Sequence, residues 1–178
     1  MDNRNQQQRG RGGQGGRKPR YGQRQESEFD SKLLDLARVT RVVAGGRRFS
    51  FRALVGVGDK KGRIGVGLAK GSDVSIAIDK ASRQGQKKMV TVPMKNGTIT
   101  RETDAKFKAA KVYLWPRKSG LMIGGVLRQM AKLAGIEGIT GKIRGSSNKI
   151  ANARAFIIAI EKLHNNANTR ITTEKEKK

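Results

Sequence analysis

The sequence predicts an α+β protein of two small domains, residues 28–92 and residues 93–164. In the first, apolar residues alternate along 47–57 and 64–68, which is the period of half-buried strands, and a helical stripe follows. In the second, an Asn-Gly dipeptide at 96–97 marks a tight hairpin, and two later segments carry apolar residues at helical spacing. The predicted order of elements is α-β-β-β-α and then β(3)-α-β-α.

The first domain is expected to begin with a short helix over residues 28–36 and a strand over 39–43. A turn at 44–46 then leads into a long strand over 47–57. The residues expected on one face of that strand are Phe49, Phe51, Ala53, Val55 and Val57. After a third strand at 64–68, Ser72 is the expected N-cap of a helix. The expected buried stripe of this helix is Val74, Ala77, Ile78, Ala81 and Gly85.

The second domain is expected to open with a hairpin that joins residues 90–92 to residues 98–100. The elements expected after it are a strand over 108–114, a helix over 121–134, a strand over 139–144 and a helix over 149–163. Gly135 is the expected end of the first of these helices. Ser147 or Asn148 is the expected cap of the second.

Net charge gives the first indication of function. The chain has 39 Lys and Arg residues against 14 Asp and Glu residues, a formal net charge of +25 on 178 residues. A compact protein with this charge needs a polyanionic partner, and nucleic acid fits because each neutralised phosphate releases counterions. An anionic membrane would require a basic amphipathic helix or a lipidation signal, and the sequence shows neither. We therefore expect a nucleic-acid partner and no membrane.

Both ends of the chain differ from the middle in composition. Residues 1–24 are rich in Gly, Gln and Arg and lack apolar periodicity, which predicts a disordered basic arm. This arm either runs along RNA or is a solvated tail without a role. Residues 165–178 are polar and charged, and we expect a loose tail there.

The sequence offers no catalytic site. It lacks Cys, and its single histidine, His164, cannot form a metal site or a His-based triad alone. No carboxylate pair is placed for acid–base chemistry. The glycine clusters at 56–62 and 65–72 do not have the spacing of a dinucleotide fingerprint or a P-loop. We expect no enzyme activity, no metal and no cofactor.

The basic residues are concentrated around the predicted strands and turns of the first domain. An α-β-β-β-α order with a basic turn and a basic helix is typical of double-stranded-RNA-binding folds, which contact phosphates and 2′-hydroxyls by shape. The scarcity of aromatic residues argues against a base-stacking domain. Phosphate contact is one interpretation, and a solvated sheet face is the other. The candidate contacts are Arg41, Arg47, Arg48, Arg52, Lys60, Lys61, Arg63 and Lys70, with Gly45 and Gly46 at the hairpin tip.

Several short motifs in the chain form a familiar set. They are residues 42–51, 58–59, 62–67, 96–98, 133–136 and 145–148, followed by Arg154-Ala155. In this order and at this spacing they resemble the bacterial small-subunit ribosomal protein S5 family over residues 28–164. The resemblance implies a double-stranded-RNA-binding-like first domain. It also implies a two-layer second domain with a left-handed crossover, which the usual right-handed rule would not predict.

The resemblance also implies a function and further site residues. It implies a structural protein of the cytoplasmic ribosome that binds 16S rRNA, contacts ribosomal proteins four and eight of the small subunit, and influences accuracy where mRNA enters. It adds Ser146, Ser147, Asn148 and Arg154 to the rRNA-binding candidates. It implies a protein interface at Arg117, Gly120, Gly124, Gly125 and Arg128. The alternative for the last set is a tight strand-to-helix turn beside a solvated arginine.

Two other functions remain open from the sequence. A free RNA chaperone or RNA-processing accessory protein could use the same RNA-binding domain. An RNA-modifying enzyme would need a cofactor or acid–base site that the sequence lacks.

Overall fold

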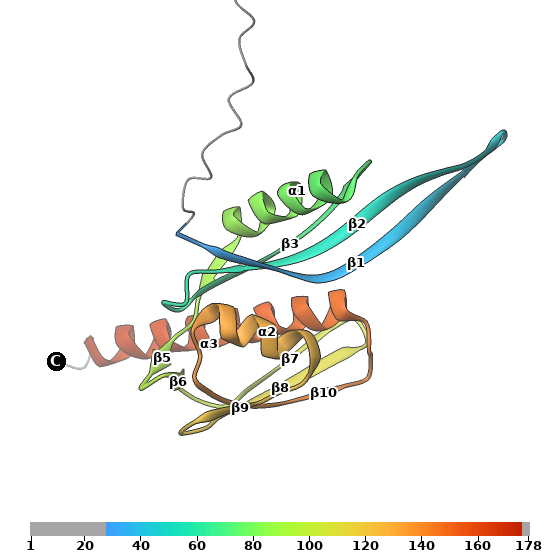
Figure 1. Cartoon of the computed structure of the whole chain (residues 1–178). Coiled ribbons are helices and arrows are strands. Elements are labelled where there is room, and N and C mark those ends of the chain that lie inside the picture. Colours follow the sequence, from blue (N-terminus) through green and yellow to red (C-terminus); the bar gives the residue numbers. More distant parts are fainter. Residues whose placement is uncertain (1–27, 176–178) are drawn as a thin grey trace, which may run out of the picture.

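The structure is a computed structural model that describes the backbone of residues 28–175 and the side chains of residues 28–165. The predicted arm at residues 1–24 lies outside the described residues. Figure 1 shows four layers, which are a helix, a sheet, a pair of helices and a second sheet. The helices are α1 (Val74–Lys87), α2 (Gly125–Ala134) and α3 (Lys149–Lys175). The α+β class is confirmed.

The first sheet lies between α1 and the α2–α3 layer. Its strands, in spatial order, are β1 (Asp30–Val43), β2 (Gly46–Gly58), β3 (Arg63–Gly71) and β4 (Met89–Thr91). The alternation predicted for β2 is confirmed, because Ala53, Val55 and Val57 pack on α1. Leu54 points the other way and is also buried, in the core shared with α2 and α3. β2 is therefore covered on both faces along its second half.

The helix expected at residues 28–36 is wrong. Residues 30–43 form one strand that pairs with β2 over its whole length, with a register shift between Leu33 and Asp35. The leucines of this segment fit a helical spacing as well as a strand, and pairing with the long β2 decides between them. The shift lets Leu34 enter the core while Leu33 stays partly exposed. The observed order of the first domain is β-β-β-α-β, because β4 follows α1.

The buried stripe of α1 is confirmed at Ala77, Ala81 and Gly85. Its cap is Asp73 rather than Ser72. The Oδ1 atom of Asp73 accepts a hydrogen bond from the Val74 N–H at 2.7 Å. A carboxylate at this position satisfies an N–H group that has no partner within the helix, so it competes successfully with the neighbouring hydroxyl.

The second sheet lies below α2 and α3, and its other face is open (Figure 1). Its strands are β5 (Met94–Lys95), β6 (Thr98–Ile99), β7 (Thr103–Phe107), β8 (Ala110–Pro116), β9 (Gly120–Met122) and β10 (Gly138–Arg144). The spatial order is β5-β6-β10-β8-β7, and β9 pairs with β10 in parallel. α2 connects β9 to β10, and the left hand of this crossover stays a prediction.

The tight turn at Asn96-Gly97 is confirmed, with φ values of 53° and 73° that suit a type I′ hairpin. Its first strand is Met94–Lys95 rather than residues 90–92, because Met89–Thr91 instead pairs with β3. The strand β7 was not predicted. Its turn into β8 is made by Lys108 at φ 54°, a position without the usual Gly or Asn signal.

The ends of α2 and α3 agree with the predictions only in part. α2 begins at Gly125 rather than 121, since residues 120–122 pair with β10. Gly135 ends it in the left-handed region, at φ 78°, as predicted. Asn148 is the cap of α3, because its Oδ1 accepts from the Ile150 N–H at 3.0 Å. α3 continues to Lys175, so the expectation of a loose tail at 165–175 is wrong.

One core joins the two sheets. It contains Leu54 and Ile64 from the first sheet, Leu133 from α2, and Phe156 and Ile160 from α3. The turn between β2 and β3 also docks on the end of α2, where the Lys60 N–H donates to the Leu133 carbonyl at 3.0 Å. The orientation of the two sheets is therefore fixed by packing and by backbone hydrogen bonds. Among the described helices, none is long and apolar enough to cross a membrane.

Candidate nucleic-acid interface

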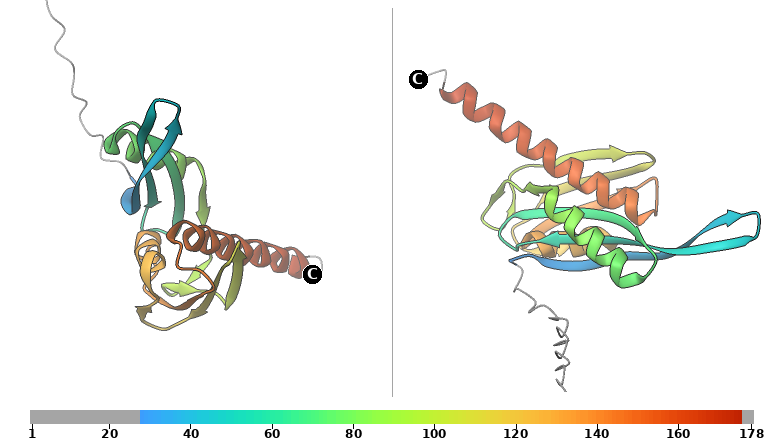
Figure 2. Two further views of the ribbon diagram at one scale, coloured as in Figure 1. Left: turned by 90° about the vertical axis from the view of Figure 1, so that its right-hand side faces the viewer. Right: turned by 90° about the horizontal axis from the view of Figure 1, so that it is seen from above.

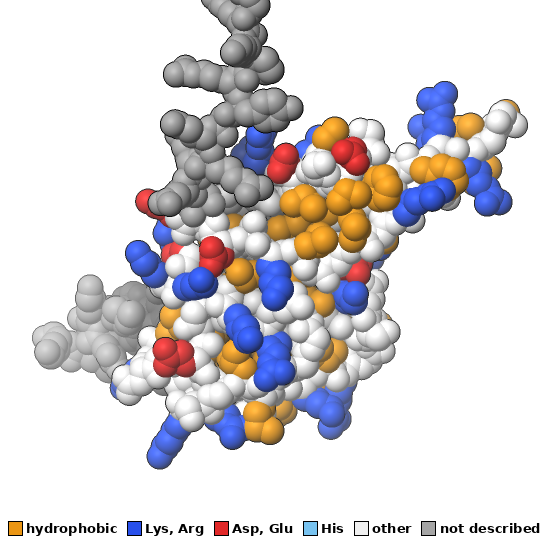
Figure 3. Space-filling model, in the orientation of Figure 1, with side chains coloured by type: hydrophobic (Ala, Val, Ile, Leu, Met, Phe, Trp, Pro, Cys, Tyr) orange, Lys and Arg blue, Asp and Glu red, His pale blue; other side chains and the backbone are white. Residues whose placement is uncertain are grey.

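The free half of the β1–β2 hairpin projects far beyond the rest of the protein (Figures 1 and 2). Among the described residues, nothing covers either face of this half, and residues 40–42 and 44–49 are exposed. Figure 3 shows Lys and Arg side chains on both of its sides. We call residues 37–52 the basic hairpin. An uncovered two-stranded ribbon is only marginally stable by itself, so this extension is held by the covered half of the same strands.

One side of the basic hairpin carries cations in opposing pairs. Arg41 is the Cα partner of Arg48, and Arg52 is the Cα partner of Lys70 in β3. Side chains of directly opposed residues lie on the same face, so like charges there repel one another. These four residues, which we call the basic face, lie on the side of the sheet that carries Leu54. The structure therefore brings together four of the predicted contacts.

The opposite side of the hairpin combines a cation with an aromatic ring. The Arg38 guanidinium lies 3.7 Å from the centroid of the Phe49 ring. Arg47 lies opposite Val42, which is 74% exposed. Sequence reasoning missed Arg38, because the expected helix placed it in a linker. Arg38 is the Cα partner of Phe51, so it lies diagonally across from Phe49 on the same face. This position follows only from the strand register.

The hairpin tip leaves room for a close approach. Gly46 has φ 138°, a conformation that L side chains rarely adopt, whereas Gly45 has no positive φ. A Cβ atom at either position would meet nothing within 4 Å. The need for glycine is therefore conformational at Gly46, and both positions leave backbone accessible to a partner.

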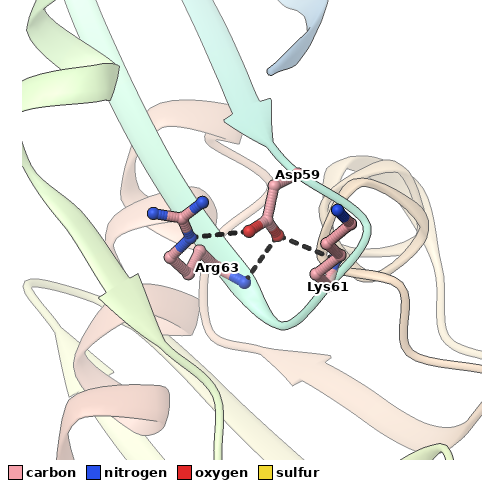
Figure 4. Close-up of polar contacts among 3 residues, drawn as sticks. All are labelled: Asp59, Lys61 and Arg63. Carbon is pink, nitrogen blue, oxygen red and sulfur yellow. Dashed lines mark hydrogen bonds and ion pairs between the residues drawn. The ribbon is translucent and has the colours of Figure 1, made fainter. Parts of the chain in front are cut away.

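The turn between β2 and β3 is organised around Asp59 (Figure 4). Its Oδ1 accepts from the backbone N–H groups of Lys61 at 2.8 Å and Arg63 at 2.9 Å. Its Oδ2 accepts from Nε of Arg63 at 2.6 Å. Burial alone would raise the pKa of the Asp59 carboxyl, but the hydrogen bonds from Arg63 and Lys61 and the charge of Arg63 outweigh it and lower the pKa.

This network changes the interpretation of three predicted RNA contacts. The Arg63 side chain is committed to Asp59 and lies 5.3 Å from the Phe29 ring centroid. Lys60 pairs with Asp30 at 2.5 Å. Lys61 is exposed and contributes only its backbone N–H to the network. The turn thus serves as a joint between the sheets. Of its three basic side chains, that of Lys61 is the one not paired with an aspartate of the described residues.

A second group of predicted residues lies at the start of α3. Ser146 and Ser147 line a cavity of about 540 Å³ together with Gly125 at the start of α2 and Arg144 at the end of β10. Asn152 also lines it, is 4% exposed, and its Oδ1 has no hydrogen-bond partner among the described residues. Exposed N–H groups at helix starts favour anions. The structure thus joins residues that the sequence had assigned to separate RNA and protein sites.

Lys149 connects this group to strand β1 of the first sheet. Its Nζ lies 2.9 Å from Oδ1 of Asp35, whose Cα partner is Leu54 on β2. The start of α3 therefore lies beside the same side of the sheet as the basic face. Arg154 is separate from this group. It is exposed, lies 5.4 Å from the Phe107 ring centroid, and lines a cavity of about 330 Å³ between β3 and α3.

The predicted protein-interface residues lie around β9 and the start of α2. All five, Arg117, Gly120, Gly124, Gly125 and Arg128, are exposed. The Arg117 N–H donates to Oγ1 of Thr98 at 3.2 Å, and its guanidinium contacts Met122. Gly120 and Gly125 have φ values of 86° and 56°, so the turn needs them whatever else they contact. A Cβ at Gly124 would meet open space.

Within the described residues, no group of three or more His, Cys, Asp or Glu side chains is placed to hold a metal ion. The described surface is instead dominated by unpaired or weakly paired cations. Its chemistry is suited to binding phosphates rather than to transferring groups.

Comparisons with known proteins agree with this picture. Residues 29–93 match the family described as ribosomal protein S5, N-terminal domain, and residues 105–172 match its C-terminal domain. The chain is 44% identical over 140 residues to small ribosomal subunit protein uS5 of Treponema pallidum, covering 78% of this chain and 81% of that protein. It is 41% identical over 144 residues to uS5 of Thermus thermophilus, covering 80% of this chain and 89% of that protein. The chain therefore belongs to the uS5 family of small-subunit ribosomal proteins.

Proposed function

We propose that this chain is a structural component of the small ribosomal subunit that binds 16S rRNA mainly through the basic hairpin. The uS5 family is a family of non-enzymatic ribosome components. The observation that carries the proposal is the pairing of Arg41 with Arg48 on an uncovered ribbon. Such a pair is unfavourable in the free protein and becomes favourable when phosphates lie between the guanidinium groups.

The rRNA contacts proposed from the sequence divide into two kinds. Arg41, Arg48, Arg52 and Lys70 form the basic face and are proposed as direct phosphate contacts. Lys60 and Arg63 form ion pairs with Asp30 and Asp59. Their proposed contribution is therefore to fix the shape of the turn and to add to the positive electrostatic potential around it. The remaining proposed contacts are Gly45, Gly46 and Arg47 at the tip, Lys61, Ser146, Ser147 and Asn148, and Arg154.

The start of α3 is proposed as a second contact with the same RNA. Its support is the cavity in which two helix starts, Arg144 and the Ser146–Ser147 segment come together. Phosphate oxygens accept hydrogen bonds from such N–H groups and hydroxyls. Because Lys149 places this cavity on the side of the basic face, one RNA segment can contact both.

We further propose contacts with ribosomal proteins four and eight, a position near the channel by which mRNA enters, and an influence on decoding accuracy. These rest on the family resemblance and on the exposed loop at residues 117–125 with Arg128. Arginine on an exposed face is enriched at protein interfaces. The cytoplasmic ribosome is the proposed location.

Sedimentation tests the role in the subunit against that of a free chaperone. Tagged full-length chain is expressed in cells, and ribosomal subunits are separated after washing at increasing salt. We expect the chain to remain with the small subunit, because an assembled component is held by shape and burial as well as by charge. A chain that leaves the subunit at the salt that removes loosely bound factors would support the chaperone alternative instead.

A further inference from the structure

Apart from Arg144, which also lines the cavity at the start of α3, the open face of the second sheet carries side chains that the proposed function does not use. Strand pairing sets three rows across β7, β8 and β10. Lys106, Lys111 and Arg144 form one row, Asp104, Tyr113 and Lys142 form the next, and Trp115 pairs with Thr140. The residues that alternate with these along the strands point the other way. Among them, Ala105, Val112, Leu114 and Ile139 are buried under α2 and α3. The rows therefore point away from the protein.

Two aromatic rings lie together at the centre of this outer face. The Tyr113 and Trp115 rings are nearly parallel, with an interplanar angle of 12° and 6.1 Å between centroids. The Arg144 guanidinium lies 5.9 Å from the Tyr113 ring centroid. Trp115 is 40% exposed although it is one of the largest apolar side chains in the chain. Aromatic residues are scarce in this chain, but two of them meet here.

Four cations lie on the same outer face as the two rings. Lys106, Lys111, Lys142 and Arg144 are exposed, and none of them is in an ion pair with another described residue. Two acidic residues, Glu102 and Asp104, line a hollow of about 340 Å³ beside the rings. Asp104 is partly neutralised by Lys162 at 3.5 Å. The outer face is therefore positive overall. Lys142 lies opposite Tyr113, and the other three cations form the row on the side of Tyr113 away from Trp115.

We propose that the outer face binds single-stranded RNA by stacking bases on Tyr113 and Trp115 while Lys111, Lys142 and Arg144 hold the phosphates. The antiparallel strands β7, β8 and β10 form an open surface with central aromatic rings and flanking cations. Such a surface presents both components of single-strand binding. The site is on a different sheet from the basic hairpin and does not depend on it.

Single strands suit this surface better than a duplex or a peptide. In a duplex the bases are stacked on each other, so the faces of Tyr113 and Trp115 would contact only sugar and phosphate. An acidic peptide could satisfy the cations, but it would leave the aromatic faces without a flat partner. The unpaired bases of a single strand supply both the flat surface and the charge.

Tryptophan fluorescence tests the proposal in the full-length chain, because Trp115 is its only tryptophan. The protein is titrated with a short oligoadenylate and, separately, with an RNA duplex of equal length. We expect the oligoadenylate to quench Trp115 and the duplex not to. Tyr113→Ala should weaken oligoadenylate binding by about fivefold or more, the loss typical of removing one stacking ring.

Matched variants separate stacking from general stickiness. Trp115→Leu keeps apolar area without a stacking face and should weaken binding, whereas Tyr113→Phe should retain it. Because Trp115→Leu has no tryptophan, the affinities of these variants are measured by the fluorescence anisotropy of a dye-labelled oligoadenylate. Ile76→Ala removes a similarly exposed apolar side chain, 42% against 40%, on the far layer and should change nothing. Equal quenching by the duplex, or unchanged oligoadenylate affinity in both Tyr113→Ala and Trp115→Leu, would overturn the proposal. Loss of duplex binding in hairpin variants bears on the proposed function alone.

Discussion

Arg41 and Arg48 face each other across the basic hairpin as Cα partners, at a point where no other element of the described part of the chain covers the strands. Two guanidinium groups in this position raise the energy of the free protein and lower that of a complex with phosphates. The arrangement therefore trades stability for binding, and stability and affinity should respond to it in opposite directions.

Removing one member of the pair should stabilise the free protein. Arg48→Ala is expected to raise the free energy of unfolding by up to about 1 kcal/mol, since opposed like charges are destabilising by that order. The gain should shrink as salt screens the repulsion. Arg47→Ala, whose partner is Val42, is the control and should show little salt dependence. Chemical denaturation at two ionic strengths measures both, and a salt-independent loss of stability in Arg48→Ala would contradict the account.

The tip of the hairpin should tolerate a side chain at one glycine only. Gly46→Val places a β-branched residue at φ 138° and is expected to destabilise the hairpin by about 1–3 kcal/mol. Gly45→Val should be close to neutral, because Gly45 lacks a positive φ and its Cβ meets open space. Amide hydrogen exchange along residues 40–50 reports the difference. Equal exchange in the two variants would show that the backbone at Gly46 is not strained.

The Asp59 network should make stability fall in acid. Since the folded pKa of Asp59 lies below its unfolded value, its contribution is present above the unfolded pKa of about 3.9 and is lost as pH falls through the folded pKa. At neutral pH, Asp59→Asn should lose about 1.5–3 kcal/mol, the range for hydrogen bonds to charged groups. Below about pH 4 the gap should close. A double variant with Arg63→Gln should lose less than the sum of the single variants.

The joint between the sheets should depend on Gly135. Its φ is 78°, and a Cβ there would lie 2.1 Å from the Lys60 carbonyl oxygen. Gly135→Ala is expected to lose more than about 2 kcal/mol, since both strain and a backbone clash must be relieved. Gly124→Ala is the control, because that position has φ −93° and open space. Urea denaturation compares the two, and similar midpoints would mean that the turn does not hold α2.

The loop before α2 should affect decoding if the proposed contact with ribosomal protein four holds. Arg128 is exposed on α2, so Arg128→Glu should fold and enter the subunit normally. It should nevertheless change the misreading rate in a translation assay, because the charge reversal alters an interface. Lys32→Glu, an exposed charge reversal on β1, is the control. A parental misreading rate in Arg128→Glu would place this influence elsewhere.

Local signals predicted much of the fold. The Asn96-Gly97 turn, the end of α2 at Gly135 and the buried faces of β2 and α1 each follow from residue types that strongly prefer one conformation. The leucines at 33–36 carried no such preference, and only the length of β2 makes them a strand. Lys108 in the β7–β8 turn gave no sequence signal at all.

The candidate site was predictable in composition but not in grouping. Sequence analysis selected Arg41, Arg48 and Lys70, yet the opposed pairs appear only when the register is known. The sequence predicted Arg63 as a phosphate contact. Its hydrogen bonds to Asp59 could not be foreseen, because they depend on the shape of the turn. Tyr113 and Trp115 are two residues apart, but Lys142 and Thr140, which lie opposite them on the outer face, come from β10, more than twenty residues away in sequence.

The salt dependence of binding to 16S rRNA tests the central claim most directly. Arg41→Ala with Arg48→Ala is compared with Lys32→Ala and Lys95→Ala, two exposed lysines outside the proposed interface, so that both variants lose the same charge. The quantity compared is the slope of the logarithm of the binding constant against the logarithm of salt concentration. If Arg41 and Arg48 each contact one duplex phosphate, the hairpin variant should reduce the magnitude of this slope by about 1.8, which is about 0.9 for each phosphate. The control should keep the parental slope. Equal slopes in the two double variants would contradict the proposal that this hairpin holds the RNA.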